Sequence, residues 1–243
     1  MKEKQAKQIL EQVRKSYDSI ADHFSQTRYR DWPEFSFFKQ YSKSGDKVLD
    51  AGCGNGRLYA SLKEMQVDYT GIDLSPQLIK KAKSKYPQAK FSVADVLNLP
   101  FTAEEFGSVI SVATLHHIPS SEFQDQVIKQ FYRVIKPGGY LMLTVWNLKQ
   151  ENFQQKIAQL PPKNIIEQKV GKVKDIWWPW KNSQGKVLTK RYLHSFSQTE
   201  LEKLVNRNGF VIIKSFYSQK GEITDKNQGY NLCLIAQKML WLA

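Results

Sequence analysis

Short apolar runs alternate with segments of helical period through the middle of the chain. The runs are rich in β-branched residues, and the segments between them carry apolar residues every three or four positions. Alternation at this spacing favours a parallel sheet covered by helices on both faces. Strands are predicted at residues 47–51, 68–72, 89–93, 108–114 and 140–146, with helices near 57–65, from 76 onward and at 121–135.

The N-terminal segment has its own helical pattern. Apolar residues recur at helical spacing at Ile9, Val13, Tyr17, Ile20 and Phe24. This pattern predicts an amphipathic helix whose apolar stripe packs on the main sheet. The stretch 23–33 is too polar and irregular for core, and a second helix is expected near 34–41.

Two signals mark the C-terminal part. Ser197 followed three residues later by Glu200 matches a capping box, so a helix is predicted from there to about residue 206. Segments 210–217 and 230–237 are predicted to form an antiparallel strand pair. Residues 147–196 show no clean period, but their tryptophans and isoleucines would be costly to expose, so we expect an ordered insertion.

Charge adds an indication of the partner. The 243 residues include 36 Lys and Arg against 23 Asp and Glu, a formal net charge of +13. An excess of this size attracts polyanions, although a merely solvated lysine surface would give the same count. Basic residues gather in the N-terminal helix and again between 156 and 191. The second group is interleaved with Trp177, Trp178, Trp180 and Tyr192, as in surfaces that stack bases and follow phosphates.

Targeting signals and cysteines indicate the cellular setting. No stretch of about 18 apolar residues predicts a membrane helix, and the charged N-terminus lacks the apolar centre of a secretory signal. Cys53 and Cys233 fit a reducing cytoplasm and argue against a disulfide framework or a cysteine-rich zinc site. We therefore expect a cytoplasmic protein without a membrane partner.

A glycine-rich turn follows the first predicted strand. The strand ends near Asp50, and Gly52, Gly54 and Gly56 follow at alternate positions before a helix start. Glycines there allow a sharp turn and leave room for a nucleotide-like ligand beside the helix N-terminus. The dinucleotide fingerprint places two residues between its last glycines, so the even spacing here favours a different nucleoside ligand.

Acidic residues follow the next two predicted strands. A carboxylate at Asp73 can accept both hydroxyls of a ribose, because sheet ligands lie outside the carboxyl ends of the strands. The alternative for Asp73 is a helix N-cap. Leu74 can pack on an adenine face, and Asp95 can accept from an adenine amino group unless it is only a solvated turn residue.

Together with the Lys136-Pro137-Gly138-Gly139 turn, these features resemble class I S-adenosylmethionine-dependent methyltransferases. The resemblance implies a Rossmann-like α/β fold, with a mostly parallel seven-stranded sheet and a C-terminal antiparallel pair. It also implies S-adenosylmethionine as cofactor, in one domain over residues 1–243 with a helical lid at 1–44 and a basic aromatic insertion at 147–196. The cofactor-binding residues that it implies are Asp50, Gly52, Cys53, Gly54, Asn55, Gly56, Asp73, Leu74, Asp95, Val96 and Thr114.

The flanking segments narrow the resemblance. Residues 17–33, 115–117, 145–150 and 191–194 are similar to the tRNA wobble-uridine carboxymethyl methyltransferases, and Lys149 and Gly107 depart from that pattern. The family esterifies 5-carboxymethyluridine in tRNA. The resemblance therefore implies tRNA, rather than DNA, as the polyanion. It also implies a small zinc-binding activator protein, as in the eukaryotic members.

Candidate catalytic residues follow from that reaction. A carboxylate acceptor is already nucleophilic and needs alignment more than proton removal. Arg28 is the first candidate to hold it, unless Arg28 pairs with an acidic loop residue. Tyr17 and His23 are expected to shape the lid, and His116 and His117 are candidates for substrate contact. Trp32, Trp146, Arg191 and Tyr192 are the expected substrate-binding residues.

Three interpretations remain open at this level: a tRNA carboxyl methyltransferase, a small-molecule methyltransferase and a non-catalytic RNA-binding module. A metal site is not expected, because neighbouring histidines project apart and no further ligand cluster is evident. A small-molecule methyltransferase similar to quinone-biosynthesis enzymes would leave the basic aromatic insertion unexplained. A non-catalytic RNA-binding module of the same fold would not need the glycine loop with both carboxylates.

Overall fold

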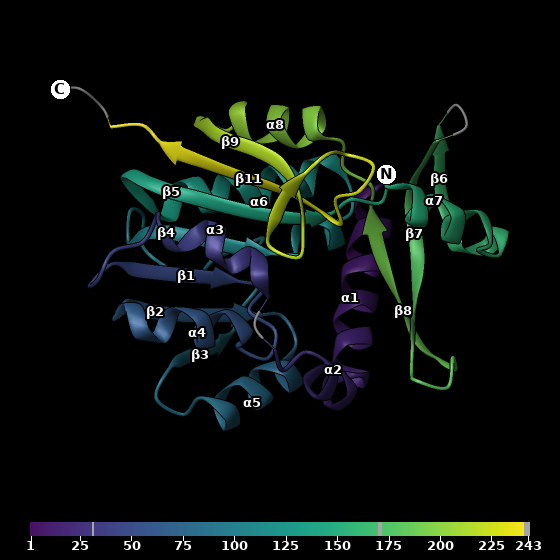
Figure 1. The fold of residues 1–243 in the computed structure, drawn as a ribbon, viewed down its shortest axis with the longest axis horizontal. Helices are drawn as coiled ribbons and strands as arrows, with labels where there is room; N and C mark the ends of the chain where they lie inside the picture. Colours follow the sequence, from purple (N-terminus) through teal and green to yellow (C-terminus); the bar gives the residue numbers. More distant parts are fainter. Residues whose placement is uncertain (31, 170–171, 241–243) are drawn as a thin grey trace.

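The computed structural model describes residues 1–30, 32–169 and 172–240, with side chains over these ranges except at 167–174. Its main element is a sheet in the order β10-β9-β11-β5-β4-β1-β2-β3 (Figure 1). Strands β3, β2, β1, β4 and β5 are parallel, and β11 is antiparallel to both β5 and β9. The strands are β1 (Lys47–Ala51), β2 (Asp68–Asp73), β3 (Lys90–Val93), β4 (Phe106–Val112), β5 (Ile135–Trp146), β9 (Phe210–Gln219), β10 (Glu222–Thr224) and β11 (Asn231–Lys238).

The predicted Rossmann-like sheet is therefore confirmed, with two differences of detail. The short β10 adds an eighth strand that the sequence did not indicate. Strand β5 begins at Ile135, so the predicted breaker at 136–139 lies inside the strand. Gly138 has a φ of +80°, and the register between β4 and β5 shifts at this point, so the turn is absorbed as an irregularity of the ladder.

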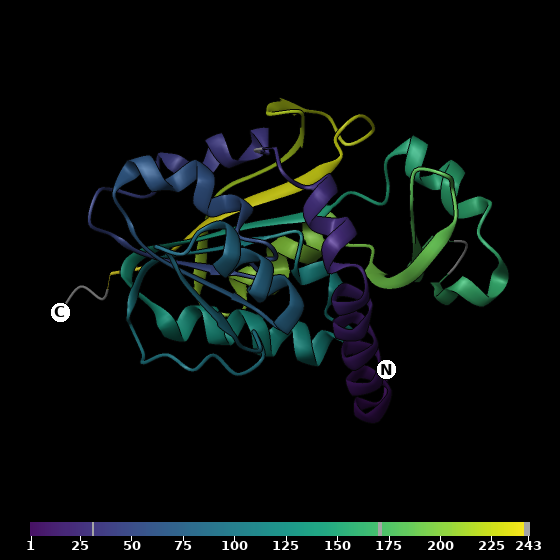
Figure 2. The same ribbon diagram turned by 90° about the horizontal axis from the view of Figure 1, so that it is seen from below.

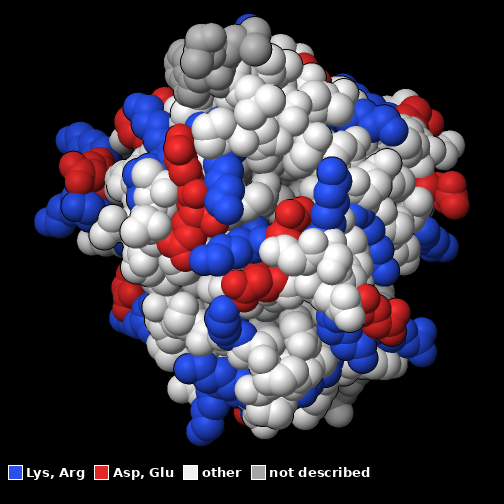
Figure 3. Space-filling view, turned by 90° about the vertical axis from the view of Figure 1, so that its left-hand side faces the viewer, with Lys and Arg blue, Asp and Glu red and all other residues white. Residues whose placement is uncertain are grey.

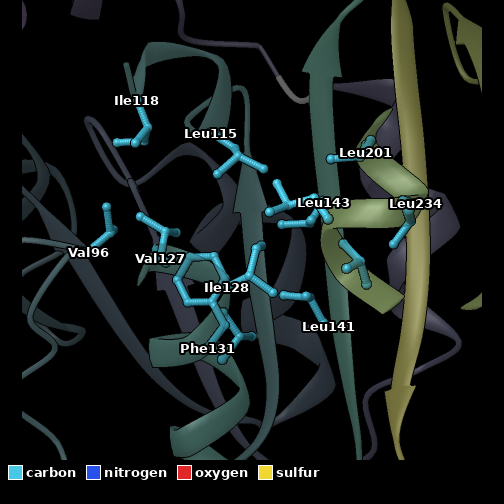
Figure 4. Close-up of a cluster of buried hydrophobic side chains, with 14 of the residues drawn as sticks. Val96, Leu115, Ile118, Val127, Ile128, Phe131, Leu141, Leu143, Leu201 and Leu234 are labelled. Atoms are coloured by element: carbon cyan, nitrogen blue, oxygen red, sulfur yellow. The ribbon is translucent and has the colours of Figure 1, made fainter. Parts of the chain in front are cut away.

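Helices cover both faces of the main sheet. Leu141 and Leu143 of β5 pack with α6 and α8 on one face (Figure 4), whereas Met142 packs on the opposite face with α3, α4 and α5. This alternation follows from the two-residue side-chain period of a strand. The helices are α3 (Ser36–Lys39), α4 (Arg57–Leu62), α5 (Pro76–Lys85), α6 (Ser121–Val134) and α8 (Gln198–Asn206), with short 3-10 turns η1 (Pro33–Phe35), η2 (Lys63–Met65) and η3 (Leu115–His117).

The N-terminal helix differs from the prediction. It divides at Ile20 into α1 (Glu3–Ser19) and α2 (Ala21–Thr27). Ile9 and Val13 of α1 pack on Tyr192 of β8 (Val187–His194), outside the main sheet, while Ala6 joins the main core. Helix α1 therefore lies between the main sheet and the insertion (Figures 1 and 2). The expectation that its apolar stripe packs on the main sheet is wrong for most of the helix.

The described residues of the insertion form a second sheet (Figure 2). This small sheet has the antiparallel order β6-β7-β8, and helix α7 packs beside it. Leu148, Ile157, Ile176 and Leu193 are the buried residues of its own core. The elements are α7 (Glu151–Ala158), η4 (Pro162–Asn164), β6 (Ile165–Lys169), β7 (Lys172–Lys181) and β8 (Val187–His194).

The distribution of charge modifies the expectation of a basic cluster in the N-terminal helix. Along α1, Lys7, Arg14 and Lys15 form ion pairs with Glu3, Glu11 and Asp18, so much of the basic N-terminal cluster is neutralised within the helix. On the face drawn in Figure 3, basic and acidic side chains are interspersed rather than gathered by sign. In the described part of the chain, no helix is long and apolar enough to cross a membrane.

Candidate active site

A cavity of about 810 Å³ opens at the carboxyl ends of β1, β2 and β4. The strand order reverses between β1 and β4, which is where open α/β sheets bind their ligands. Helices α1 and α2 and the segment after them cover one side, and Trp146, Trp180 and Arg191 form another. The main sheet, the N-terminal segment and the small sheet thus each contribute to one cavity.

The glycine loop forms the floor of the cavity beside β1. Gly52, Gly54 and Gly56 all have positive φ, at +88°, +55° and +78°. A Cβ at Gly52 would lie 2.0 Å from Oγ1 of Thr114, so this position excludes any side chain. The backbone N–H groups of Gly52 and Cys53 both donate to the carbonyl of Ile72, at 2.8 Å, and hold the turn against β2.

Two carboxylates line the cavity beside this loop. Asp73 Oδ2 accepts from the Gly54 N–H at 2.9 Å and Oδ1 from the Ser75 N–H at 2.8 Å. Burial raises the pKa of Asp73 to about 6, although these donors stabilise its anion. Asp50 is 2 % exposed and accepts from the Tyr69 hydroxyl at 2.6 Å, and burial raises its pKa to about 7.

The predicted adenine end of the site lies in the same cavity. Leu74, Asp95 and Val96 all line it, as do Cys53 and Asn55. Asp95 Oδ1 accepts from the Leu97 N–H at 2.9 Å, which orients its carboxylate at the end of β3. The helix-cap alternative for Asp73 does not hold, because the N-cap of α5 is Ser75, whose side chain accepts from the Leu78 N–H.

Arg191 of β8 is a buried cation in an aromatic cage. It is 4 % exposed, and its guanidinium lies 4.5 Å from the ring centroid of Trp180, 5.1 Å from that of Trp146 and 5.9 Å from that of Tyr17. Its Nη1 donates to the Tyr17 hydroxyl at 3.3 Å, and its buried Nε has no hydrogen-bond partner. Among the described residues, no carboxylate forms an ion pair with it.

A hydrogen-bond chain orients the Tyr17 hydroxyl toward this arginine. His117 Nδ1 lies 2.7 Å from the carbonyl oxygen of Tyr192, which can only accept, so Nδ1 carries the proton. His117 Nε2 therefore accepts from the Tyr17 hydroxyl, also at 2.7 Å. Burial and the positive charge of Arg191 lower the pKa of His117 to about 3, so the ring is neutral.

Arg28 shares the Trp180 ring with Arg191. Its guanidinium lies 5.0 Å from the Trp180 centroid, and Nη1 donates to the Thr27 carbonyl at 3.3 Å. Burial and the nearby Arg191 lower the pKa of Arg28. No carboxylate pairs with Arg28 among the described residues, and the acidic residue of its own loop, Asp31, lies outside them, so the alternative of pairing with an acidic loop residue stays a prediction.

Four of the predicted site residues do not line the cavity. His23 accepts at Nδ1 from Trp180 Nε1, at 2.9 Å. His116 is buried and accepts at Nδ1 from the Trp146 N–H, at 3.1 Å, and burial lowers its pKa well below the usual value. Gly56 caps α4, and Tyr192 is fully buried against α1. The other sixteen predicted residues lie at the cavity: Tyr17, Arg28, Trp32, Asp50, Gly52, Cys53, Gly54, Asn55, Asp73, Leu74, Asp95, Val96, Thr114, His117, Trp146 and Arg191.

Among the cavity residues that the sequence did not indicate as part of the site, Trp180 and Phe24 are central. Trp180 stacks with Phe24 at 5.7 Å between centroids and lies under both arginines. A Cβ at Gly54 would meet the Phe24 ring at 3.4 Å, so this ring covers the glycine loop. The aromatic run at 177–180 indicated a functional surface. Which of its side chains face the cavity depends on the small sheet, which the sequence did not reveal.

Comparisons with known proteins agree with this geometry. Residues 49–143 match the family described as "Methyltransferase domain". The tRNA (carboxymethyluridine(34)-5-O)-methyltransferase of Arabidopsis thaliana is 43% identical over 58% of this chain and 34% of its own length. Its counterpart in Saccharomyces cerevisiae is 33% identical over 76% of this chain and 62% of its own length. This chain thus spans only part of these relatives.

Solved structures show the same fold. An S-adenosylmethionine-dependent methyltransferase from Methanosarcina mazei superposes with a TM-score of 0.65 at 23% identity, covering 84% of this chain and 97% of that one. A putative methyltransferase from Haloferax volcanii, in complex with the Trm112 activator, gives a TM-score of 0.64 at 15% identity, covering 92% and 96%. Residues 49–143 therefore form a methyltransferase domain, and the chain has the fold of S-adenosylmethionine-dependent methyltransferases.

Proposed function

We propose that this protein methylates the carboxylate of 5-carboxymethyluridine at the wobble position of tRNA, forming a methyl ester. The observation that carries the proposal is Arg191, a buried cation without a carboxylate partner among the described residues, in the same cavity as the glycine loop and Asp73. A buried charge without a counterion is costly, so the site is complete when an anionic substrate group binds. The names of the relatives point to the same acceptor.

The residues beside β1 and β2 fit S-adenosylmethionine. Gly52 and Gly54 let a ligand approach the loop backbone closely, Asp73 presents a carboxylate suited to ribose hydroxyls, and Leu74 and Val96 offer apolar contacts for a base. Asp50 adds a second carboxylate, suited to the cationic end of the molecule. When bound, S-adenosylmethionine supplies an electrophilic methyl group on a sulfonium.

The remaining side of the cavity fits the acceptor. The Arg191 guanidinium can hold a carboxylate through charge-assisted hydrogen bonds while Tyr17 fixes its orientation. Trp146 and Trp180 exclude water around this pair, which strengthens the electrostatic attraction. The acceptor carboxylate needs no general base, and a neutral His117 serves to orient Tyr17 rather than to remove a proton.

The two arginines are suited to different groups of the substrate, because they differ in burial. Arg191 lies deeper, at 4 % exposure, and is suited to the acceptor carboxylate, whereas the half-buried Arg28 is suited to a neighbouring phosphate. Residues 1–44 would then act as the lid and residues 147–196 as the wall that carries Arg191. We propose tRNA as the polyanion that the net charge of +13 attracts. A small activator protein like the partner of the Haloferax volcanii enzyme remains a prediction for this chain.

The test uses labelled S-adenosylmethionine, the purified protein and bulk tRNA from cells that lack the endogenous activity. The tRNA is digested to nucleosides for mass spectrometry, and a parallel sample is treated with mild alkali. A labelled uridine derivative that loses its methyl group in alkali supports the proposal. Alkali-stable label, or no label even after a cell extract is added to supply an activator, contradicts it.

A further inference from the structure

The mouth of the cavity carries cationic and aromatic side chains that the proposed methyl transfer does not use. We call Tyr29, Arg30, Trp32 and Arg57 the rim, since all four line the cavity and are at least partly exposed to solvent. Tyr29, Arg30 and Trp32 belong to the segment after α2, and Arg57 is the first residue of α4. The rim therefore joins the N-terminal segment to the helix that follows the glycine loop.

Tyr29 is placed as a surface for stacking. Tyr29 is 60% exposed, although burying its ring would be favourable because burial removes apolar surface from water. The Arg30 guanidinium lies 5.5 Å from the Tyr29 ring centroid, and Arg30 is itself exposed. An exposed ring beside a cation offers a flat contact for a base together with a charge for the adjoining phosphate.

The rim is held in place by its neighbours. Arg57 Nε donates to the Arg30 carbonyl, and its guanidinium lies 5.8 Å from the Trp32 ring centroid. Asn55, in the glycine loop, donates from Nδ2 to the Arg28 carbonyl at 3.2 Å. These two hydrogen bonds tie the backbone at Arg28 and Arg30 to the glycine loop and to the start of α4, and Tyr29 lies between the two tied positions.

We propose that the rim is a subsite for the RNA strand that flanks the methylated uridine, with a base on Tyr29 and a backbone phosphate at Arg30. This inference rests on the proposed function, because it takes the acceptor to be a nucleotide within RNA. The inner cavity already accounts for the cofactor at the glycine loop and for the carboxylate at Arg191. An RNA strand that places one nucleotide in the inner cavity must carry the adjoining nucleotides across the rim, where an exposed aromatic ring and a cation lie together.

The experiment compares two acceptors that differ only in their flanks: the free nucleoside 5-carboxymethyluridine and an anticodon stem-loop that carries it. Arg30→Glu should lower kcat/KM for the stem-loop at least about tenfold, and Tyr29→Ala about tenfold, with the nucleoside unaffected. Arg30→Glu should also weaken stem-loop binding, measured by fluorescence anisotropy, and reduce its salt slope by about 1. Lys136→Glu, an exposed charge reversal at the amino end of β5, is the matched control and should change neither acceptor.

Two results overturn the inference: stem-loop binding and turnover that are unchanged in both rim variants, or an equal loss on both acceptors. The first means that the strand does not touch the rim, and the second that the rim shapes the inner site. Failure of the proposed function is distinct, because the unmodified protein would then methylate neither acceptor. The anisotropy measurement needs no turnover and reports on the rim even in that case.

Discussion

Arg191 is the residue on which the proposed chemistry depends most. It combines burial, three aromatic contacts and one hydroxyl partner, and no described carboxylate neutralises it. The motif at residues 191–194 predicted Arg191 as a substrate-binding residue, but the sequence could not show that Arg191 lies deeper than Arg28. That ranking depends on β8 crossing α1, which no local pattern encodes.

The first prediction concerns this cation. Arg191→Met replaces the arginine with an apolar side chain of similar length, which removes the charge and the hydrogen-bond donors. Because charge-assisted hydrogen bonds are the strong ones, kcat/KM for the carboxylate acceptor should fall about 100-fold or more. The affinity for S-adenosylmethionine, measured by calorimetry, should stay within about twofold, since Arg191 lies on the acceptor side. Retained turnover would remove Arg191 from the acceptor site.

The second prediction concerns the pH dependence of cofactor affinity. Burial raises the pKa of Asp73 to about 6, so in the free protein a proton competes for this carboxylate as pH falls toward that value. Ribose hydroxyls stabilise the anion, and affinity should therefore be full near pH 8 and decline below about 6. Calorimetry at pH 8 and 5.5 checks this. Asp73→Asn should bind weakly at both values, and an unchanged affinity across that range in the native protein would contradict the role of Asp73.

At the scale of elements, the parallel sheet and its helices were predictable, whereas the small sheet was not. The capping box at Ser197 and Glu200 is present as expected, with both reciprocal hydrogen bonds, because caps are local signals. In β7, by contrast, Trp177 packs on Tyr192 and Trp178 on Phe153, so apolar residues face both sides and no alternation is left to detect. The break at Ile20 was missed for a related reason, since the apolar spacing continues across it.

The small sheet is joined to the main domain by a buried ionic cluster. His194 of β8 lies 2.7 Å from Asp175 of β7 through Nδ1 and 3.2 Å from Glu200 of α8 through Nε2. Burial lowers the pKa of His194, but the hydrogen bonds to the two carboxylates outweigh it, and the pKa is raised overall. The cluster thus stabilises a charged histidine at the junction that positions β8 and Arg191.

The third prediction follows from that raised pKa. A histidine with a folded-state pKa above its unfolded value near 6.5 contributes stability that is fully present below pH 6.5 and is lost as pH rises through the folded pKa. Urea unfolding should therefore show a decrease in the free energy of unfolding above pH 6.5. His194→Ala leaves the buried Asp175 carboxylate without this cation and should cost about 3 kcal/mol or more at pH 6, with a flatter pH profile. An equal cost at pH 6 and pH 9 would contradict the charged cluster.

At the scale of the whole molecule, the cavity is assembled from segments far apart in the chain. The glycine loop comes from the main sheet, Tyr17 and Arg28 from the N-terminal segment, and Arg191 from the small sheet. The net charge of +13 remains the global clue to a polyanion, but the ion pairs of α1 show that counting basic residues overstates the free charge there. Recognition of RNA is therefore better sought at the rim than along the N-terminal helix.

The most direct test of the account uses anticodon stem-loops with a defined wobble nucleotide. One carries 5-carboxymethyluridine, a second the neutral amide 5-carbamoylmethyluridine and a third plain uridine, and transfer of labelled methyl groups is measured with and without a zinc-binding activator. One alkali-labile methyl group is expected on the first stem-loop and none on the other two. Equal labelling of the amide or of plain uridine, or no labelling of the carboxylate under either condition, would contradict it.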